Sequence, residues 1–163
     1  GVRCSGHIRS ALGEFDLEQI DAFAHHDWSA GYMRPETHWN WACLSGRAER
    51  QRVGLNLSCG VNETSFTENC YWLDGELIKV DTVRFDFQRR RPLEPWRIDS
   101  HDGQVALRFE ARGLHQEHMN LGILASNFKQ IFGQFSGVLR PVGRPEVSIA
   151  NCWGFVEDQY VKW

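Results

Sequence analysis

Apolar side chains recur at every second position within residues 37–75, and this period constrains the fold more than any other feature of the sequence. Across residues 53–59 the odd-numbered positions are apolar, whereas the even-numbered ones hold glycine, asparagine and serine. Trp39 and Trp41 share one face of the preceding run in the same way. Because successive side chains of a β-strand point to opposite faces, the pattern predicts strands. The Asp74-Gly75 pair that ends the stretch is typical of a β-hairpin turn.

The rest of the chain repeats short strand-like runs separated by turn signals. We expect one long strand at residues 76–87, with a bulge near Asp81 because the apolar side changes there, and a polar loop at residues 112–120. Residues 121–139 are apolar and contain glycines, which indicates one or two strands with the glycines at bends or close backbone approaches. Residues 126–132 could instead hold a short helical turn. No window of twelve or more residues keeps a helical period. Eight to ten short strands predict an all-β domain, either an antiparallel barrel or a strongly curved sandwich.

A length of 163 residues suits a single domain with one sizeable core. We expect residues 14–163 to form this domain. Residues 1–13 are small and polar with little period, so we expect them to be a linker or a tail from a missing upstream domain. Because the sequence begins at Gly1 without a methionine, we expect it to be cut from a longer polypeptide, whose upstream domain would then be a partner of this one.

Charge and cysteine content exclude several classes of protein. Eighteen basic and twenty-one acidic residues give a net charge of −3, and the basic residues are scattered apart from Arg89 to Arg91, which predicts no nucleic-acid partner. No run reaches the roughly 20 apolar residues that a membrane helix needs, so we expect no membrane span. The five cysteines are odd in number and lie mostly in apolar runs, which is typical of reduced, buried thiols and indicates a cytoplasmic protein.

Three acids stand out because each lies near a tryptophan in the sequence: Asp27, Glu68 and Glu157. A carboxylic acid in an apolar, aromatic-lined cavity has a raised pKa and can protonate a substrate near neutral pH. We take Asp27 and Glu68 as the catalytic candidates and Glu157 as a ligand-binding one. The alternative is that all three lie near strand ends and pair with backbone amides or with arginines.

Tryptophans and asparagines complete the candidate binding surface. Asparagine is depleted in strands, so Asn56 and Asn69 would either bind a ligand hydroxyl or carbonyl group, or satisfy a bulge or a turn. Any single tryptophan can belong to a core, but seven are more than a compact small barrel needs, and the set indicates a ligand cavity. The ligand-binding residues that we expect are Trp39, Trp41, Asn56, Asn69, Trp72, Trp153 and Glu157.

The spacing of histidines and cysteines argues against a metal site. His25 and His26 are adjacent and would face opposite ways in a strand, while His115 and His118 lie in polar sequence. The sequence contains neither C-x-x-C nor H-E-x-x-H. It also lacks glycine-rich phosphate loops, and GQFSG has Phe135 where the nucleophile of a G-x-S-x-G motif would lie. We therefore expect no metal and no cofactor.

Eight segments taken together resemble a known family. They are DWSAGY, THWNWA, VGLNL, TENCYWLDG, PWRI, DGQVALRF, FGQFSGVL and GFVEDQYVKW. In this order they are similar to the domains of unknown function of family 2804, over residues 24–163. The resemblance implies that the chain is the carboxy-terminal half of a longer member. By fold analogy it also implies a lipocalin-like (calycin) barrel, as in carotenoid hydratases and tocopherol cyclases. No activity is assigned to the family, so it supplies no catalytic residues.

Three functions fit these observations. The first is binding of a small apolar or amphipathic molecule in a tryptophan-lined pocket inside the barrel. The second is a cofactor-independent hydratase, cyclase or isomerase acting on a lipid-like or isoprenoid substrate, with Asp27 or Glu68 as general acid and indole faces stabilising a developing positive charge. The third is a structural module that packs on a missing amino-terminal half. The sequence does not choose between them.

Overall fold

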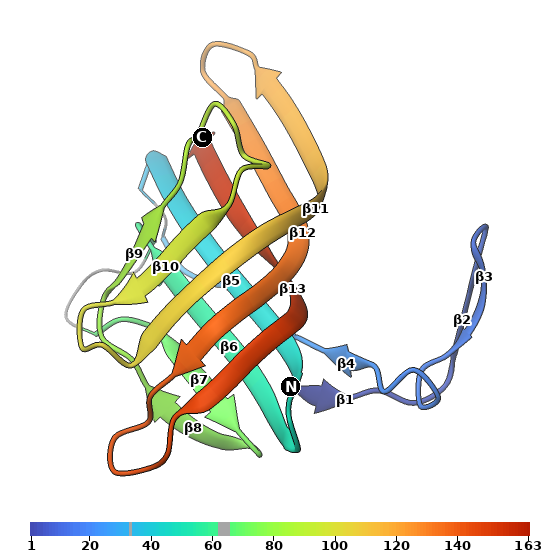
Figure 1. The fold of residues 1–163 in the computed structure, drawn as a ribbon. Coiled ribbons are helices and arrows are strands. Elements are labelled where there is room, and N and C mark those ends of the chain that lie inside the picture. The colour runs from blue at the N-terminus through green and yellow to red at the C-terminus, as the bar shows by residue number, and fades with distance from the viewer. Residues whose placement is uncertain (33, 62–65) are drawn as a thin grey trace.

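The computed structural model describes residues 1–32, 34–61 and 66–163, and these residues form strands and turns without a helix. Nine of the strands form one antiparallel sheet in the order β8-β7-β6-β5-β13-β12-β11-β10-β9, which curls into a half-barrel (Figure 1). The strands are β5 (Glu36–Ala48), β6 (Gln51–Cys59), β7 (Cys70–Leu73), β8 (Glu76–Lys79), β9 (Val83–Asp86), β10 (Trp96–Ser100), β11 (Val105–Asn120), β12 (Ala125–Leu139) and β13 (Val147–Lys162). The prediction of an all-β antiparallel barrel or curved sandwich is confirmed.

Four short strands precede the curled sheet. They are β1 (Val2–Arg3), β2 (His7–Ser10), β3 (Gly13–Asp16) and β4 (Phe23–Ala24). β1 pairs with β4, and β2 pairs with β3. Figure 1 shows the first pair beside the curled sheet and the second pair extending away from it.

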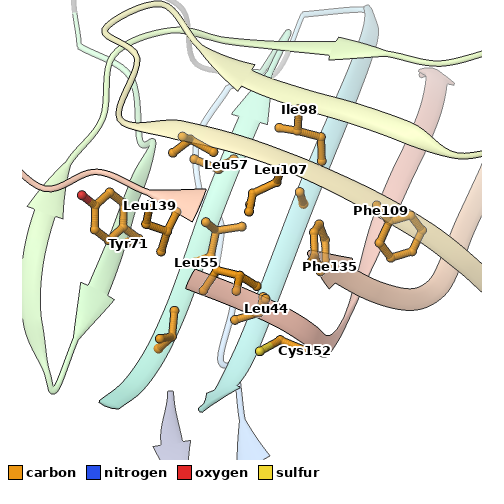
Figure 2. Packing of buried hydrophobic residues seen from close by; sticks show 14 of the residues in the cluster. Leu44, Leu55, Leu57, Tyr71, Ile98, Leu107, Phe109, Phe135, Leu139 and Cys152 are labelled. Atoms are coloured by element: carbon orange, nitrogen blue, oxygen red, sulfur yellow. The ribbon is translucent and has the colours of Figure 1, made fainter. Parts of the chain in front are cut away.

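The hydrophobic core fills the concave side of the curled sheet (Figure 2). Alternate residues of the central strands point inward, among them Ala42 and Leu44 of β5 and Val156 of β13. The largest fully buried side chains are Trp96, Tyr71, Phe109 and Phe135. Burying a large apolar side chain stabilises the fold by about 1.5–3 kcal/mol. The interior is thus a packed core contributed by strands β5 to β13.

Two glycines allow β12 to approach β11 closely and β13 to approach β5 closely. Gly133 of β12 and Gly154 of β13 are direct cross-strand partners. A side chain at Gly133 would collide with the carbonyl oxygen of Glu110, and one at Gly154 with that of Cys43. Glycine lacks the Cβ atom that would keep these backbones apart, so the strands approach closely here. This confirms that a glycine of the 121–139 run marks a close backbone approach.

Three local predictions were wrong. Residues 112–120 are not a loop, because β11 continues through Asn120 and pairs with β12. Residues 126–132 belong to β12 and not to a helical turn. The long strand expected at residues 76–87 is two strands, β8 and β9, at opposite edges of the sheet. The change of apolar side near Asp81 marks the corner between them, where the Asp81 amide is bound by the Asp102 carboxylate at 2.9 Å.

No helix among the described residues is long and apolar enough to cross a membrane.

Candidate ligand-binding site

A pocket of about 630 Å³ lies on the convex face of the sheet, where β5, β6 and β13 run side by side. Residues 27–31, which follow β4, cover it from outside. Its floor is formed by side chains that alternate with the core residues of the same strands, such as Trp41 beside the buried Ala42. The lining residues are Asp27, Trp28, Ser29, Ala30, Gly31, Trp39, Trp41, Ser58, Val61, Glu68, Glu157 and Trp163.

Two tryptophans of β5 form the wall of this pocket. Trp39 donates a hydrogen bond from Nε1 to Oε2 of Glu157 at 3.3 Å. Trp41 donates from Nε1 to Oδ1 of Asn56 at 2.8 Å, and its ring packs edge-to-face on Phe155 with centroids 5.0 Å apart. Because both indole N–H groups are bound within the protein, the orientation of the rings is fixed and their remaining faces are available to a ligand.

Glu157 is the buried polar group of the pocket. Its residue is only 6% exposed, and its Oε1 accepts a hydrogen bond from Nε2 of Gln130 at 2.8 Å. Burial raises the pKa of Glu157 above its ordinary value; the hydrogen bonds from Gln130 and Trp39 offset part of this rise, and the negative charge of Asp27 adds to it. The side chain can therefore accept hydrogen bonds when ionised and donate one when protonated.

The two catalytic candidates lie at the same pocket. Asp27 belongs to the covering segment, and Glu68 lies two residues before the start of β7 at Cys70. Both residues are exposed, in contrast to Glu157. The structure thus brings together five residues expected from the sequence, from segments more than 100 residues apart: Asp27, Trp39, Trp41, Glu68 and Glu157.

The other expected site residues lie outside the lining. Asn56 holds the indole of Trp41 in place. Asn69 is fully buried, where its Oδ1 accepts from the amide of Ser58 at 2.6 Å and its Nδ2 donates to the carbonyl of Asp81 at 3.2 Å. Both polar groups of the Asn69 side chain bind backbone groups of the protein. This matches the expectation that Asn69 satisfies the backbone of a bulge or turn and not the expectation that it binds a ligand.

Trp72 and Trp153 are separated from the pocket as well. Trp72 lines a different hollow of about 390 Å³ between β1 and the sheet, together with Gly54 and Arg52. Trp153 is 59% exposed and does not line either hollow. The expected ligand-binding set therefore divides into a group at the convex pocket and a group elsewhere.

Trp163 is a lining residue that the sequence analysis did not select. It lies next to β5 because β13 pairs with that strand up to Lys162 and Glu36. Its Nε1 donates to the carbonyl of Arg34 at 3.1 Å, and its backbone amide donates to Pro35. The sequence around it, EDQYVKW, is mixed in polarity and does not show which strand lies beside Trp163.

Over residues 1–163 the sequence matches the family described as Domain of unknown function (DUF2804). The chain belongs to this family. No curated protein and no solved structure matches it. The match runs from the first residue to the last and does not support the assignment to a carboxy-terminal half. The lipocalin-like character implied by the resemblance is likewise not confirmed by any structural neighbour.

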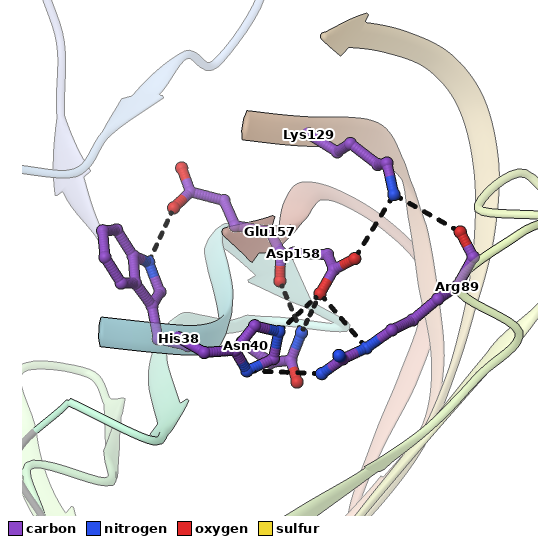
Figure 3. A network of polar contacts seen from close by, with 7 residues as sticks. His38, Asn40, Arg89, Lys129, Glu157 and Asp158 are labelled. Carbon is purple, nitrogen blue, oxygen red and sulfur yellow. Dashed lines mark hydrogen bonds and ion pairs between the residues drawn. The ribbon is translucent and has the colours of Figure 1, made fainter. Parts of the chain in front are cut away.

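The position of the pocket differs from the expected one. The tryptophans were expected inside a barrel, but the interior is filled by the core and the pocket lies on the opposite face. The reason is that both faces of β5 carry apolar side chains, so that Trp39 and Trp41 could have faced either way. Figure 3 shows the division at β13, where Glu157 and its neighbour Asp158 point in different directions. Glu157 accepts its hydrogen bond from Trp39 on the side of the pocket.

Asp158 is the centre of a polar cluster on the concave side, beyond the end of the core (Figure 3). Its Oδ1 accepts from Nδ2 of Asn40 at 3.2 Å and lies 3.2 Å from Nε2 of His38. Arg89 and Lys129 are 3.6 and 3.5 Å from its carboxylate oxygens. Arg89 lies between β9 and β10, so the carboxylate ties that connection to β5, β12 and β13. This arrangement is typical of a structural ion-pair cluster that holds neighbouring segments together.

All five cysteines are free thiols. Burial raises the pKa of Cys43 to about 12 and that of Cys70 to about 11, so both are protonated and unreactive at neutral pH. Within the described ranges, no group of three His, Cys, Asp or Glu side chains is placed to hold a metal ion.

Proposed function

We propose that this domain binds a small amphipathic molecule in the tryptophan-lined pocket of its convex face. The observation that supports the proposal is the combination of volume and lining. About 630 Å³ falls within the range of roughly 300–1,000 Å³ that is usual for small-molecule sites. Apolar walls with a few polar groups are the usual composition of such sites, and here four indoles surround three acids.

Each part of the lining has a role in this proposal. Trp39 and Trp41 are held from behind by hydrogen bonds and offer flat apolar faces to the body of the ligand. Glu157, at the buried side, orients the polar end of the ligand. Trp28 and Trp163 are 76% and 53% exposed, so they lose the most solvent contact when a ligand enters.

A neutral fluorescent probe tests this function. N-phenyl-1-naphthylamine emits weakly in water and strongly in apolar surroundings, and we expect its emission to rise saturably with the protein. Ser58→Phe would fill the pocket from β6 without altering the backbone amide that Asn69 binds. We expect this variant to weaken probe binding at least about tenfold. Ser148→Phe, at an exposed position of β13, is the matched control. Equal binding by both variants would disprove the proposal.

A second candidate function is a cofactor-independent hydratase, cyclase or isomerase acting on an isoprenoid or lipid-like substrate. The raised pKa of Glu157, beside the indole of Trp39, is the feature that favours it, because such an acid can protonate an alkene. Asp27 and Glu68 remain alternative acids at the same pocket. Incubation with geraniol in D₂O tests the chemistry: catalysis predicts deuterium on carbon by mass spectrometry and its loss in Glu157→Gln. No incorporation would leave binding as the function.

A further inference from the structure

The charges around the convex pocket all have one sign. The described residues that line it include three carboxylic acids and four tryptophans, but no lysine, arginine or histidine. Glu157 lies at the buried side, whereas Asp27 and Glu68 are exposed. The pKa of Glu157 is raised in part by the negative charge of Asp27, so the two groups are close enough to repel each other.

Cationic side chains near the pocket are turned to other partners. Arg34 donates to the carbonyl of Gly60 at 2.7 Å and is not among the lining residues. His25 packs edge-to-face on Trp41, and burial lowers its pKa below the ordinary value of 6.5, so its ring is neutral at pH 7. Lys129 contacts Asp158 on the concave side. A positive charge on a ligand would therefore be the only one inside the pocket lining that the structure describes.

The arrangement of the acids distinguishes a bulky cation from a metal ion. A metal ion needs several oxygen atoms that converge on one point at 2–2.6 Å. No such group of ligands exists among the described residues, so the acids surround a volume instead of a point. Indole faces attract alkylated ammonium groups, which are too large and too weakly hydrated for a compact oxygen cage. Aromatic walls with acids at their edges therefore match an organic ammonium ion.

We propose that the ligand of this pocket is a small quaternary ammonium compound, held between the indole faces of Trp39, Trp41 and Trp28 and the carboxylates of Glu157 and Asp27. This inference rests on the proposed binding function and adds the charge and chemical class of the ligand. The alkyl groups on nitrogen contact the rings, and the positive charge offsets the repulsion between the acids.

Choline and its uncharged carbon isostere, 3,3-dimethylbutan-1-ol, test the charge directly because they have nearly the same shape. Each is titrated against the complex of the protein with N-phenyl-1-naphthylamine, and displacement of the probe is measured. We expect choline to displace it saturably, with an affinity at least about tenfold higher than that of the isostere. We also expect the advantage of choline to fall between 0.05 and 1 M NaCl, although the fall is partial because Glu157 is buried.

Variants of the acids test whether the preference for choline over the isostere depends on the carboxylates of the pocket. Glu157→Gln and Asp27→Asn are each expected to reduce the ratio of choline affinity to isostere affinity about threefold or more. Glu146→Gln removes an exposed acid that pairs with Arg140, far from the pocket, and should leave the ratio unchanged. If the probe binds but choline and the isostere displace it equally, the ligand is not a cation and the binding function stands. If neither the probe nor choline binds saturably, both proposals are wrong.

Discussion

Trp41 and Glu157 are direct cross-strand partners on β5 and β13, and both side chains lie on the convex face of the curled sheet. Ala42, which follows Trp41, and Val156, which precedes Glu157, are also cross-strand partners. Both are completely buried in the concave core. The same two strands thus support the core with one face and the candidate site with the other. The site has a rigid floor because its backbone is fixed by the packing behind it.

Glu157→Gln should change how stability depends on pH. The pKa of Glu157 is raised by burial above its ordinary value of 4.5 in the folded protein. Below pH 4.5 the acid is protonated in both the folded and the unfolded state, and burial has no ionisation cost. Between pH 4.5 and the higher folded pKa, the unfolded state releases its proton while the folded state keeps it, so the folded state becomes less favourable until the pH has risen through the folded pKa. Glutamine has no such cost, and the amide of Gln130 can turn over to accept its hydrogen bond.

The expected result is that the free energy of unfolding of Glu157→Gln, relative to the parent, increases from pH 4.5 upward and is constant above the folded pKa. Urea unfolding at a series of pH values measures this difference. Glu146→Gln controls for the loss of one negative charge at an exposed position. A difference that does not change with pH would show that the carboxyl group of Glu157 is not desolvated.

Asp102→Asn should show the opposite dependence. The Asp102 carboxylate accepts hydrogen bonds from Ser100 Oγ at 2.6 Å, from the Asp81 amide at 2.9 Å, and from the amide and side chain of Gln104. Burial acts to raise the pKa of Asp102, but these hydrogen bonds outweigh it and hold the pKa below its ordinary value of 3.8. Their contribution is therefore complete above pH 3.8 and is lost as the pH falls through the folded pKa.

At pH 7 we expect Asp102→Asn to lower the free energy of unfolding by roughly 1–2 kcal/mol. The NH₂ group of the asparagine cannot accept hydrogen bonds, so some of the donors that face Asp102 lose their acceptor. The deficit should shrink below pH 3.8. Asp86→Asn, an exposed acid of the neighbouring strand β9, is the control in the same unfolding titration. A deficit that persists unchanged in acid would assign the effect to geometry and not to the charge of Asp102.

Asn69→Ala should be strongly destabilising although the residue does not line the pocket. The substitution leaves the amide of Ser58 and the carbonyl of Asp81 without their partner at a fully buried position. We expect a loss of roughly 1–3 kcal/mol, which is the cost of one unsatisfied buried group, because the Ser58 amide is partly buried whereas Asp81 is exposed. Asn127→Ala on β12 removes an exposed amide and should change stability by less than about 0.5 kcal/mol. Thermal and urea unfolding compare the two, and similar values would contradict the buried role.

Gly133→Ala tests the close approach of β12 to β11. The added methyl group would collide with the carbonyl oxygen of Glu110 and lie 2.7 Å from the ring of Phe109. We expect a loss of about 1–3 kcal/mol or misfolding, because backbone atoms cannot move aside cheaply. Gly113→Ala, also in the curled sheet, meets nothing within 4 Å and should be neutral or slightly stabilising. Comparable stability of both variants, measured by calorimetry, would show that β11 and β12 can separate at little cost.

The sequence predicted the strands whose two faces differ. The alternation in residues 53–59 gave the correct faces of β6, and the Asp74-Gly75 pair forms the β7–β8 turn with positive φ at both residues. It failed for residues 112–120, because that part of β11 is exposed on both sides and its polar residues carry no alternation. The corner at Asp81 was also missed, since the contacts that form it come from Asp102 and Asn69, distant in sequence.

For the candidate site, residue types were easier to predict than location. Acids and tryptophans with no obvious partner pointed to Asp27, Trp41 and Glu157, and the structure places all three at one pocket. The side of the sheet could not be predicted, because Trp41 and its neighbour Ala42 are both apolar and only the direction of curling decides which is inside. Curling depends on long-range pairing and on glycines such as Gly154, whose effect is visible only once the strands are aligned.

The two-sided use of β5 and β13 has a consequence for how such a domain can change. Because Trp39, Trp41 and Glu157 face away from the packed interior, replacing them alters what the surface recognises without opening voids beneath it. Selectivity can thus diverge between relatives, or be redesigned in the laboratory, at residues 39, 41 and 157, while their neighbours Ala42 and Val156 keep the scaffold intact.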